Sequence, residues 1–294
     1  MDISIDVGGT KIACALIEEN QILKSKKVDS IIHQNLESLP NYLFDLIKDW
    51  LPKSSSVNVA CTGQVSQDSV SFLSAGKKLP LKSRLEELTN LPVTIINDAA
   101  AAAWAEYELN QNLSKQDFVY ITVSTGVGAG IVCNGNLITC QDGFCAHLGH
   151  TTVPVKNNNV YPCHCGRSNC VEAIASGTAI AKHASSVLGE IIDCKTAFDY
   201  SSQLRAVNEV INQAADAISE LIFNMKATLG NQHVVLGGSV GNSELFFEMV
   251  NERIKRASSL YQVTLIKPVT GANADMLGVH YYAQKLKGVE LCKS

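Results

Sequence analysis

Alternating hydrophobic and polar positions open the chain and predict three strands joined by tight turns. Residues 3–7 alternate between Ile or Val and polar residues, residues 11–17 form an apolar run, and residues 21–28 alternate weakly. Such short connections favour an antiparallel meander. Apolar positions spaced by three and four then predict a helix over residues 36–50.

Strands and helices alternate over the next sixty residues. Short apolar runs at 57–61 and 93–96 predict buried strands, and a short helix is expected at 81–88. An Ala-rich helix begins at about Ala99, directly after Asn97-Asp98 closes the second of these strands. This order of elements is typical of an α/β lobe.

The pattern starts again at Asp117. Strands are predicted at 118–123, 127–133 and 135–139. A Gly-containing turn follows the first strand in both halves of the chain. A shift of 116 residues aligns five pairs of positions, which are Ile5, Val7, Ala13, Asn20 and Ile22 with Ile121, Val123, Ala129, Asn136 and Ile138. The matches are few, but the shared order of elements favours a duplicated lobe.

Two α/β lobes with a cleft between them are therefore expected. The small lobe spans 1–115 and the large lobe 116–294, with a polar, Cys-rich insertion at 140–172. Beyond the insertion, the pattern predicts strands and long helices, and the last helix can pack back on the first lobe. The predicted later elements are helices at 204–225, 245–257 and 274–286 and strands at 233–236 and 263–266.

Composition narrows the class of protein. With 46% hydrophobic and 18% charged residues, the chain can build a core. A net charge of -4 argues against nucleic acid or an anionic membrane as the main partner. No apolar run approaches the roughly 18 residues of a membrane span. The N-terminus lacks the features of a signal peptide, so we expect a cytoplasmic protein with reduced cysteines.

Two Gly-rich turns are candidates for phosphate binding. The first contains Asp6, Gly8, Gly9, Thr10 and Lys11, in which bare amides, a hydroxyl and an ammonium can meet a phosphate. Asp6 can hold magnesium through water, because Mg²⁺ prefers oxygen ligands and keeps several waters. A simple Gly-Gly turn with a capping Asp explains this segment equally well.

The second candidate turn occupies the equivalent place in the second lobe. Ser124, Thr125, Gly126 and Gly128 offer hydroxyls and bare amides without charge, which suits the outer phosphates of ATP. The segment is neither a Walker loop nor a Rossmann fingerprint, because it opens a strand and no Gly-Lys-Ser/Thr follows. A Gly-rich hairpin remains the alternative, but two such loops in register are less easily explained by chance.

Asn97 and Asp98 stand at the C-terminal end of a strand, where ligands bind in open α/β sheets. An Asp there can accept the proton of a hydroxyl that attacks a γ-phosphate. The alternative is that Asp98 only caps the following helix.

A His and three Cys residues form the strongest local signal. His150, Cys163, Cys165 and Cys170 have the residue types and spacing of a structural zinc site. Zinc would order an insertion with too few apolar residues to order itself. His164 is a rival fourth ligand, and free surface thiols are the alternative to any metal.

Two further positions are weaker candidates. Gly237 and Gly238 follow a buried strand and can accept the adenine or ribose of ATP, or form a plain strand-to-helix turn. Glu172 can bind a sugar hydroxyl or only cap the helix from Ala173.

These motifs together resemble the ROK family of sugar kinases over essentially the whole chain. The resemblance rests on residues 6–11, Asn97-Asp98, the loop 124–130, and the string from Gly149-His150 through the cysteines to Glu172. It implies an actin-like ATPase fold with ribonuclease H-like duplicated lobes, ATP and magnesium as cofactors, structural zinc, and a homodimer.

The implied activity is phosphate transfer from ATP to the 6-hydroxyl of a sugar. Asp98 would be the base, and closure of the lobes would exclude water. The other implied sugar-binding residues are Asn97, His147, His150 and Glu172, with Gly63 and Gly76 approaching the sugar. Stretches 97–106, 121–128 and 171–177 are similar to members that phosphorylate N-acetylmannosamine in sialic acid catabolism.

Some positions depart from the family pattern. His147 stands where the usual pattern has a sugar-binding Glu, which favours N-acetylmannosamine over glucose. His164 and Asn169 replace common glycines, and residues 73–81 look shortened in a region that contacts the sugar. Glucose or N-acetylglucosamine therefore remain alternative substrates. A repressor of the same family is disfavoured, because the first strand begins within four residues of the N-terminus and leaves no helix-turn-helix domain before it.

Overall fold

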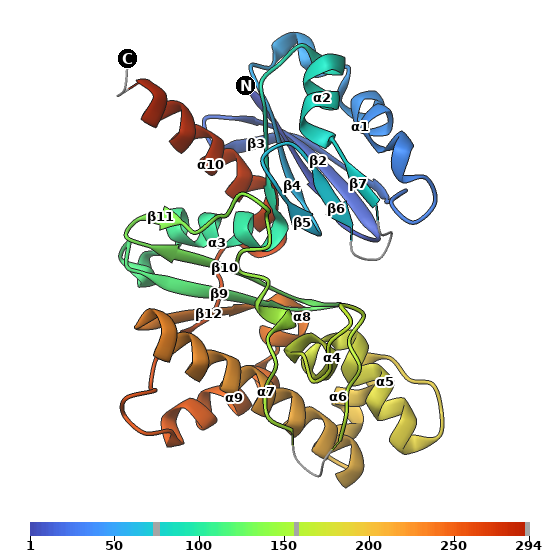
Figure 1. Ribbon diagram of the computed structural model, residues 1–294, viewed down its shortest axis with the longest axis vertical. Helices are drawn as coiled ribbons and strands as arrows, with labels where there is room; N and C mark the ends of the chain where they lie inside the picture. Colours follow the sequence, from blue (N-terminus) through green and yellow to red (C-terminus); the bar gives the residue numbers. More distant parts are fainter. Residues whose placement is uncertain (73–76, 156–158, 292–294) are drawn as a thin grey trace. The chain divides into compact units, whose positions relative to one another are not determined.

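The computed structural model describes residues 1–72, 77–155 and 159–291 and contains two compact α/β units (Figure 1). The first unit comprises Met1–Lys115, Asn136–Cys145 and Val269–Ser294, and the second comprises Gln116–Gly135 and Ala146–Pro268. The first stretch of the first unit ends at the expected boundary. Residues 136–145 and the C-terminal helix, in contrast, group with the first unit and not with the second.

The first unit is built on a five-stranded sheet in the order β3-β2-β1-β4-β8. β1 pairs antiparallel with β2 and parallel with β4, which in turn pairs parallel with β8. A small antiparallel sheet, β5-β6-β7, follows β4 in the chain. The strands are β1 (Asp2–Val7), β2 (Lys11–Glu18), β3 (Gln21–Asp29), β4 (Val57–Cys61), β5 (Gln64–Val65), β6 (Val70–Phe72), β7 (Lys77–Leu79), β8 (Val93–Asn97) and β11 (Asn136–Leu137). The helices are η1 (Leu36–Ser38), α1 (Leu39–Ile47), η2 (Leu51–Lys53), α2 (Leu81–Thr89), α3 (Asp98–Leu109), η3 (Gln111–Leu113), η6 (Gly271–Asn273) and α10 (Ala274–Leu291).

Alternation along β1 decides which side chains face the site. Ile3, Ile5 and Val7 are fully buried in one apolar cluster with side chains of α1 and α2. Residues of the other parity point to the opposite face. There the Asp2 carboxylate lies 3.6 Å from Nδ1 of His280 in α10. Asp6 therefore shares the α10 face of the sheet.

Helix α10 packs against α3 at a glycine. A Cβ built on Gly278 would lie 1.8 Å from the carbonyl oxygen of Ala101, so any larger residue would force the helices apart. Asp275 and Asp98 each precede their contact residue by three positions, which is the same face of a helix. The close approach of the helices thus brings these two carboxyl groups toward each other.

The buried carboxylate of Glu106 ties α3 to the segment that leads into α10. It accepts hydrogen bonds from the backbone N–H groups of Val269 (2.9 Å) and Thr270 (3.0 Å), from the Thr270 hydroxyl (2.6 Å) and from the Asn110 amide (2.8 Å). These bonds satisfy a charge that has no solvent-accessible surface.

Replacing Glu106 by Ala is expected to lower the free energy of unfolding by about 3 kcal/mol, because it removes the acceptor from one buried donor, the Asn110 amide, and from three part-buried donors of Val269 and Thr270. Urea denaturation monitored by circular dichroism measures this loss. Glu108→Ala is the control, since that carboxylate lies near the surface and pairs with Lys115 at 2.6 Å. An equal, small effect of both substitutions would show that the Glu106 network does not stabilise the fold.

The second unit repeats the pairing pattern of the first. β9 pairs antiparallel with β10 and parallel with β12, and β12 pairs parallel with β13. The order β10-β9-β12-β13 thus matches β2-β1-β4-β8, as the internal repeat predicts. The strands are β9 (Phe118–Val123), β10 (Val127–Cys133), β12 (His233–Gly237) and β13 (Thr264–Ile266). The helices are η4 (Leu148–His150), α4 (Val171–Ala175), α5 (Gly177–Leu188), α6 (Cys194–Ser201), α7 (Arg205–Leu229), α8 (Gly238–Gly241) and α9 (Glu244–Arg256).

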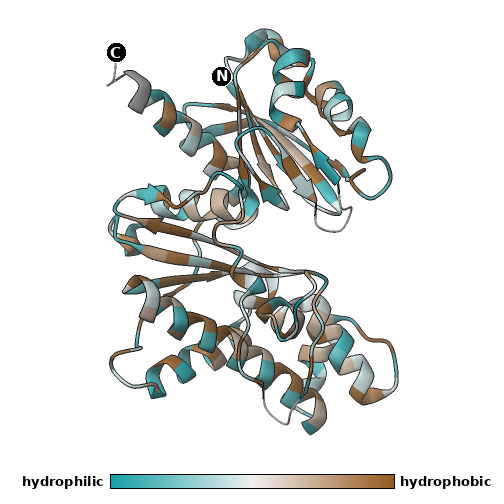
Figure 2. Ribbon diagram, in the orientation of Figure 1, coloured by the Kyte–Doolittle hydropathy of each residue, from teal (hydrophilic) through white to brown (hydrophobic). Residues whose placement is uncertain are grey.

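The core of the second unit lies between its sheet and the long helix α7. Strands β9 and β12 are hydrophobic over most of their length, whereas α7 and α9 alternate between hydrophobic and hydrophilic residues (Figure 2). The inward stripe of α7 includes Val207, Ile211, Ile218 and Leu221, all fully buried. This amphipathic pattern is what made the helix predictable.

Several elements differ from their predicted extents. The helix predicted at 36–50 is divided into η1 and α1 and ends at Ile47, and a separate short helix, η2, follows it. Prolines stand in the first turns of α1 and η2. Because Pro lacks an N–H and fixes φ, it favours helix starts over helix interiors. The strand predicted at 135–139 shortens to β11. In the described residues, no helix has the length and apolar character needed to cross a membrane.

Candidate active site and metal centre

Three carboxyl groups converge on the α10 face of the first unit. Asp6 is the last residue but one of β1, Asp98 begins α3, and Asp275 lies in the first turn of α10. Burial and then the negative charge of Asp98 raise the pKa of Asp6 to about 7. Burial, followed by the charges of Asp6 and Asp98, also raises the pKa of Asp275 well above its usual range. The three carboxyl groups thus lie close enough for the charge of one to raise the pKa of another.

Asn97, and not Asp98, provides the side-chain cap of α3. Its Oδ1 accepts from the Ala100 N–H at 3.2 Å, and its Nδ2 donates to the Gly63 carbonyl at 3.1 Å. Asp98 Oδ1 accepts from the adjacent Ala99 N–H at 2.8 Å. Asp98 is thus the first residue of α3 and not its N-cap, although its carboxylate accepts one N–H of the first turn. Gly76, the other glycine predicted near the sugar, lies outside the described residues.

The first Gly-rich turn connects β1 to β2. The Gly8 N–H donates to the Lys11 carbonyl at 3.0 Å, which closes the turn that contains Gly9 and Thr10. The ammonium of Lys11 pairs with Asp29 at the solvent-exposed end of β3. An exposed ion pair of this kind contributes little to stability, so Lys11 can exchange Asp29 for another anion at small cost.

The second Gly-rich turn connects β9 to β10 and is fixed to the start of α5. The Ser124 carbonyl accepts from the Gly177 N–H at 2.7 Å, and the Thr125 carbonyl accepts from the Thr178 hydroxyl at 2.9 Å. The Ser124 N–H donates to the Gly126 carbonyl at 2.9 Å. The carbonyl groups of Ser124 and Thr125 are thus bonded to the first two residues of α5, which anchors the turn.

Glu172 packs directly against this second turn. Its Oε2 accepts from the Val127 N–H at 3.0 Å and would lie 2.8 Å from a Cβ built on Gly126. Gly126 is therefore needed for the carboxylate to approach. The turn and the first residues after the Cys cluster form one connected structure, which also contains Gly128 in β10.

Gly237 and Gly238 lie at the end of β12, as predicted. A Cβ on Gly237 would lie 2.7 Å from the Tyr120 hydroxyl, and one on Gly238 would lie 2.3 Å from the Val123 carbonyl oxygen. Gly238 also has a φ of +83°, which favours glycine. Close packing on β9 explains both glycines, and their contact with ATP stays a prediction.

The predicted zinc ligands come together in the second unit. Single ligand atoms of His150, Cys163, Cys165 and Cys170 all lie within 4.8 Å of one another. The Sγ atoms of Cys165 and Cys170 are 3.6 Å apart, and Cys163 Sγ is 3.6 Å from His150 Nδ1. A tetrahedral Zn²⁺ with Zn–S bonds of about 2.3 Å and a Zn–N bond of about 2.0 Å separates its ligands by about 3.6–3.8 Å. The donor set therefore fits zinc, and His150 fills the fourth position for which His164 was the rival.

Backbone and side-chain hydrogen bonds hold the loop that carries the cysteines in position. The Cys163 N–H donates to the Arg167 carbonyl at 2.8 Å, and the Arg167 guanidinium donates to the His150 carbonyl at 3.1 Å. The His147 ring stacks on the His150 ring, with centroids 6.3 Å apart. Burial raises the pKa of the Cys170 thiol to about 12. A bound Zn²⁺ would remove that proton, since thiolates are its ligands.

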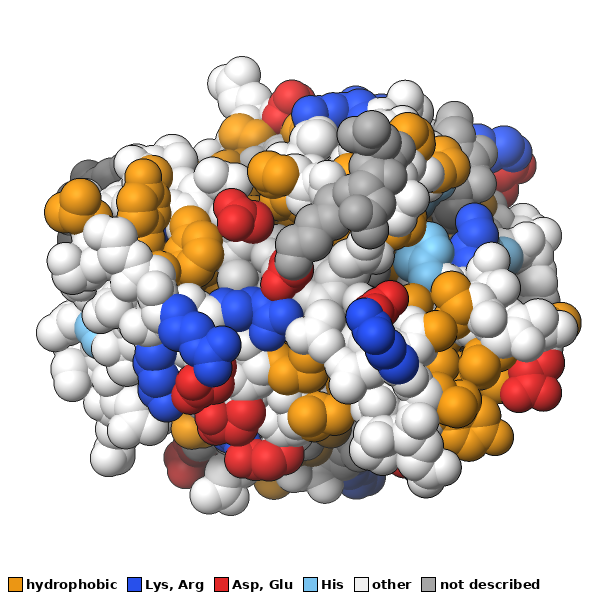
Figure 3. Space-filling model, turned by 90° about the horizontal axis from the view of Figure 1, so that it is seen from below, with side chains coloured by type: hydrophobic (Ala, Val, Ile, Leu, Met, Phe, Trp, Pro, Cys, Tyr) orange, Lys and Arg blue, Asp and Glu red, His pale blue; other side chains and the backbone are white. Residues whose placement is uncertain are grey.

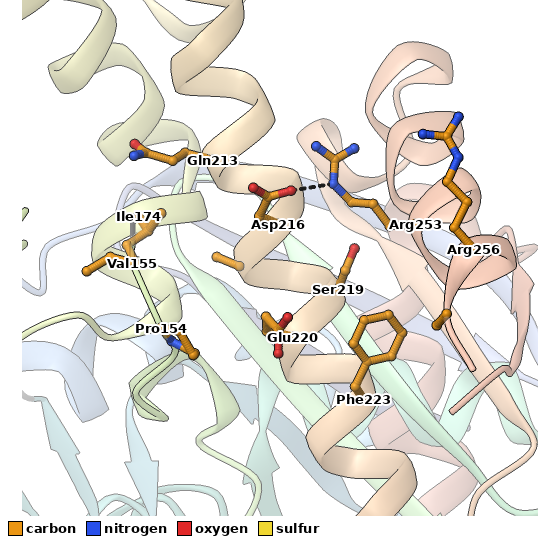
Figure 4. A pocket seen from close by; sticks show the side chains of 12 residues that line it. Pro154, Val155, Ile174, Gln213, Asp216, Ser219, Glu220, Phe223, Arg253 and Arg256 are labelled. Atoms are coloured by element: carbon orange, nitrogen blue, oxygen red, sulfur yellow. Dashed lines mark hydrogen bonds and ion pairs between the residues drawn. The ribbon is translucent and has the colours of Figure 1, made fainter. Parts of the chain in front are cut away.

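A separate hollow lies on the second unit, and none of the predicted site residues lines it. It has a volume of about 410 Å³ and is lined mainly by α7, α9 and the segment at Pro154 and Val155 (Figure 4). Within it, Arg253 and Asp216 form an ion pair at 2.6 Å that fixes α9 on α7. Acidic and basic side chains lie next to one another on the face seen in Figure 3.

Sequence reasoning missed Asp275. A single Asp in the first turn of a helix is common, because it complements the helix dipole. Its position beside Asp6 and Asp98 follows from the Gly278–Ala101 contact, which joins segments 177 residues apart. The Gly within the last predicted helix was the one available signal, since Gly is unfavourable inside a helix unless packing requires it.

Comparison with known proteins agrees with this architecture. The duplicated α/β units have the actin-like ATPase fold. A ROK hexokinase from Thermus thermophilus superposes with a TM-score of 0.83 at 26% identity, over 96% of this chain and 99% of that one. A ROK glucokinase from Streptomyces griseus, solved with glucose and AMPPNP, gives a TM-score of 0.80 at 24% identity, over 97% and 99% of the two chains.

The family follows from the sequence comparison. Residues 2–286 match the model of the ROK family, and the chain belongs to that family. A relative from Escherichia coli (strain ATCC 8739) named N-acetylmannosamine kinase is 37% identical over 289 residues, which are 96% of this chain and 98% of that protein. A Vibrio cholerae relative of the same name is 34% identical over 278 residues, or 93% and 94% of the two chains.

Proposed function

We propose that this protein is an ATP-dependent kinase that phosphorylates N-acetylmannosamine at its 6-hydroxyl, in sialic acid catabolism. The observation that carries the proposal is the identity of 34–37% to relatives named N-acetylmannosamine kinase, over 93–96% of the chain. The products would be N-acetylmannosamine 6-phosphate and ADP.

The first unit would supply the base and one phosphate-binding turn. Asp98 would take the proton of the sugar's 6-hydroxyl. The hydroxyl oxygen would bond to the γ-phosphorus of ATP, and the bond between that phosphorus and the oxygen that leaves with ADP would break. Asn97 donates a hydrogen bond to the Gly63 carbonyl, and these two residues would position the sugar beside Asp98. Asp6, Gly8, Gly9, Thr10 and Lys11 would bind phosphate.

The second unit would supply the other contacts. Its turn with Ser124, Thr125, Gly126 and Gly128 would bind the outer phosphates, and Gly237-Gly238 would meet the nucleoside. His147, His150 and Glu172 would hold sugar hydroxyls. Glu172 is suited to this because the Val127 N–H holds one of its oxygens in place.

Two metal ions belong to the proposal. Zinc bound by His150, Cys163, Cys165 and Cys170 would order the loop on which the sugar-binding residues stand. Magnesium would neutralise charge on the phosphates, with Asp6 as its carboxylate on the protein. The oxygen chemistry of Asp6 and its buried, negatively charged surroundings fit a divalent cation.

A coupled assay of ADP release tests the proposal. Folded, zinc-loaded protein with ATP and Mg²⁺ should turn over N-acetylmannosamine with a kcat/KM at least about tenfold above that for N-acetylglucosamine or glucose, because His147 replaces a carboxylate that those sugars would use. Reactions without sugar give the background. A preference for glucose would identify another ROK hexokinase, and no sugar-dependent release would contradict kinase activity toward this panel.

A further inference from the structure

His164 stands in the metal-binding loop but is not required by the metal cluster. The four-ligand group consists of His150 and the three cysteines on either side of His164 in the chain. The His164 ring packs edge-to-face on His150, with centroids 5.3 Å apart, and 58% of its side chain is exposed. The loop's backbone bonds, such as Gly166 N–H to the Cys163 carbonyl at 3.0 Å, hold the residue in place.

The exposed ring faces the free side of Glu172. Nε2 of His164 lies 3.6 Å from Oε1 of Glu172, while Oε2 of the same carboxylate accepts from the Val127 N–H. A separation of 3.6 Å is too long for a direct hydrogen bond. An oxygen atom beside this pair can lie about 2.8 Å from both atoms at once and so bridge them.

We propose that His164 is a specificity-determining residue, which together with Glu172 binds a single ring hydroxyl of the sugar. The inference rests on the proposed kinase function. The His164 N–H donates to the hydroxyl oxygen, and the hydroxyl donates its proton to Glu172 Oε1. A hydroxyl can do both at once, whereas a substrate without an OH at this position leaves the His164 N–H and Glu172 Oε1 with no bridging hydroxyl across their 3.6 Å separation.

A second metal site is a weaker explanation of the same geometry. Ligand atoms of His150, His164 and Glu172 also lie within 4.8 Å of one another. This group would use His150 twice, however, and the three thiols beside it make the better zinc site. A sugar hydroxyl needs only the two side chains that remain.

Steady-state kinetics of His164→Gly and His164→Gln test the proposal on zinc-loaded protein. His164→Gly should raise the KM for N-acetylmannosamine about tenfold, the effect of one lost hydrogen bond to a substrate hydroxyl, and leave the KM for ATP and the zinc content unchanged. His164→Gln should recover part of the affinity, because its side-chain amide can donate from a similar distance.

Asn169→Gly is the matched control in the same loop. Asn169 has a φ of +59°, and its side chain accepts from the Tyr161 N–H rather than facing Glu172. Asn169→Gly should therefore leave the KM for the sugar unchanged. An unchanged sugar KM in His164→Gly would overturn the proposal, as would loss of zinc from that variant, which would make His164 a metal ligand. A wild-type protein without sugar-dependent ADP release would instead contradict the kinase function itself, and the inference with it.

Discussion

Replacing Asp98 by Asn should lower kcat about 10³-fold while the protein still binds sugar and ATP. An amide of nearly the same shape cannot accept the hydroxyl proton, so the contribution of a general base, about 10²–10⁴-fold, is lost. The fold should be retained, because the cap of α3 is Asn97 and not Asp98. Single-turnover assays with N-acetylmannosamine and isothermal titration with each ligand separate chemistry from binding.

We also expect Asp98→Asn to affect thermal stability, independently of its effect on turnover. Removing the negative charge of Asp98 relieves its repulsion of Asp6 and Asp275, whose pKa values it raises. The melting temperature of Asp98→Asn should therefore equal or exceed that of the wild type. Glu108→Gln is the control in the same helix, where the carboxylate pairs with Lys115 near the surface. Near-normal turnover in Asp98→Asn would show that Asp98 is not the base.

The elements that the sequence predicts well are those that turn one face toward an apolar core, because that face gives a regular pattern of hydrophobic residues. Strand β1 alternates because one face meets α1 and α2, and α7 has a clear stripe because one side faces the sheet. The Cys cluster was equally predictable, since four ligand residues within 21 positions leave few alternatives to a metal. Local patterns of this kind need no knowledge of the rest of the chain.

What the sequence could not predict depends on contacts between distant segments. One error was local instead: the periodicity at 36–50 concealed Pro40, which stands in the first turn of α1, and α1 ends already at Ile47. The packing of α10 on α3 through Gly278, and with it the position of Asp275, requires the tertiary structure. The choice of His150 over His164 as the fourth ligand, in contrast, was already made from the sequence, and the fold of the loop groups His150 with the three cysteines.

Replacing Cys165 by Ser should release zinc and lower the melting temperature by about 10 °C. Serine is a poor ligand for Zn²⁺, and the described residues between His150 and Glu172 include few buried apolar side chains to keep the segment ordered without the metal. A loss of about 3 kcal/mol corresponds to about 10 °C for a domain of this size. Elemental analysis of the purified protein and differential scanning calorimetry measure the two effects.

Activity should fall with the zinc, because the loop carries groups that we place on the sugar. His150 and Glu172 stand at its two ends, and Arg167 joins the loop to the His150 carbonyl. Cys140→Ser is the control, since Cys140 is exposed and lies outside the cluster. It should keep its zinc, melting temperature and kcat. A metal-free wild-type preparation that melts at the same temperature as the zinc-loaded protein would contradict a structural role for zinc, because a ligand that binds only the folded state must raise its stability.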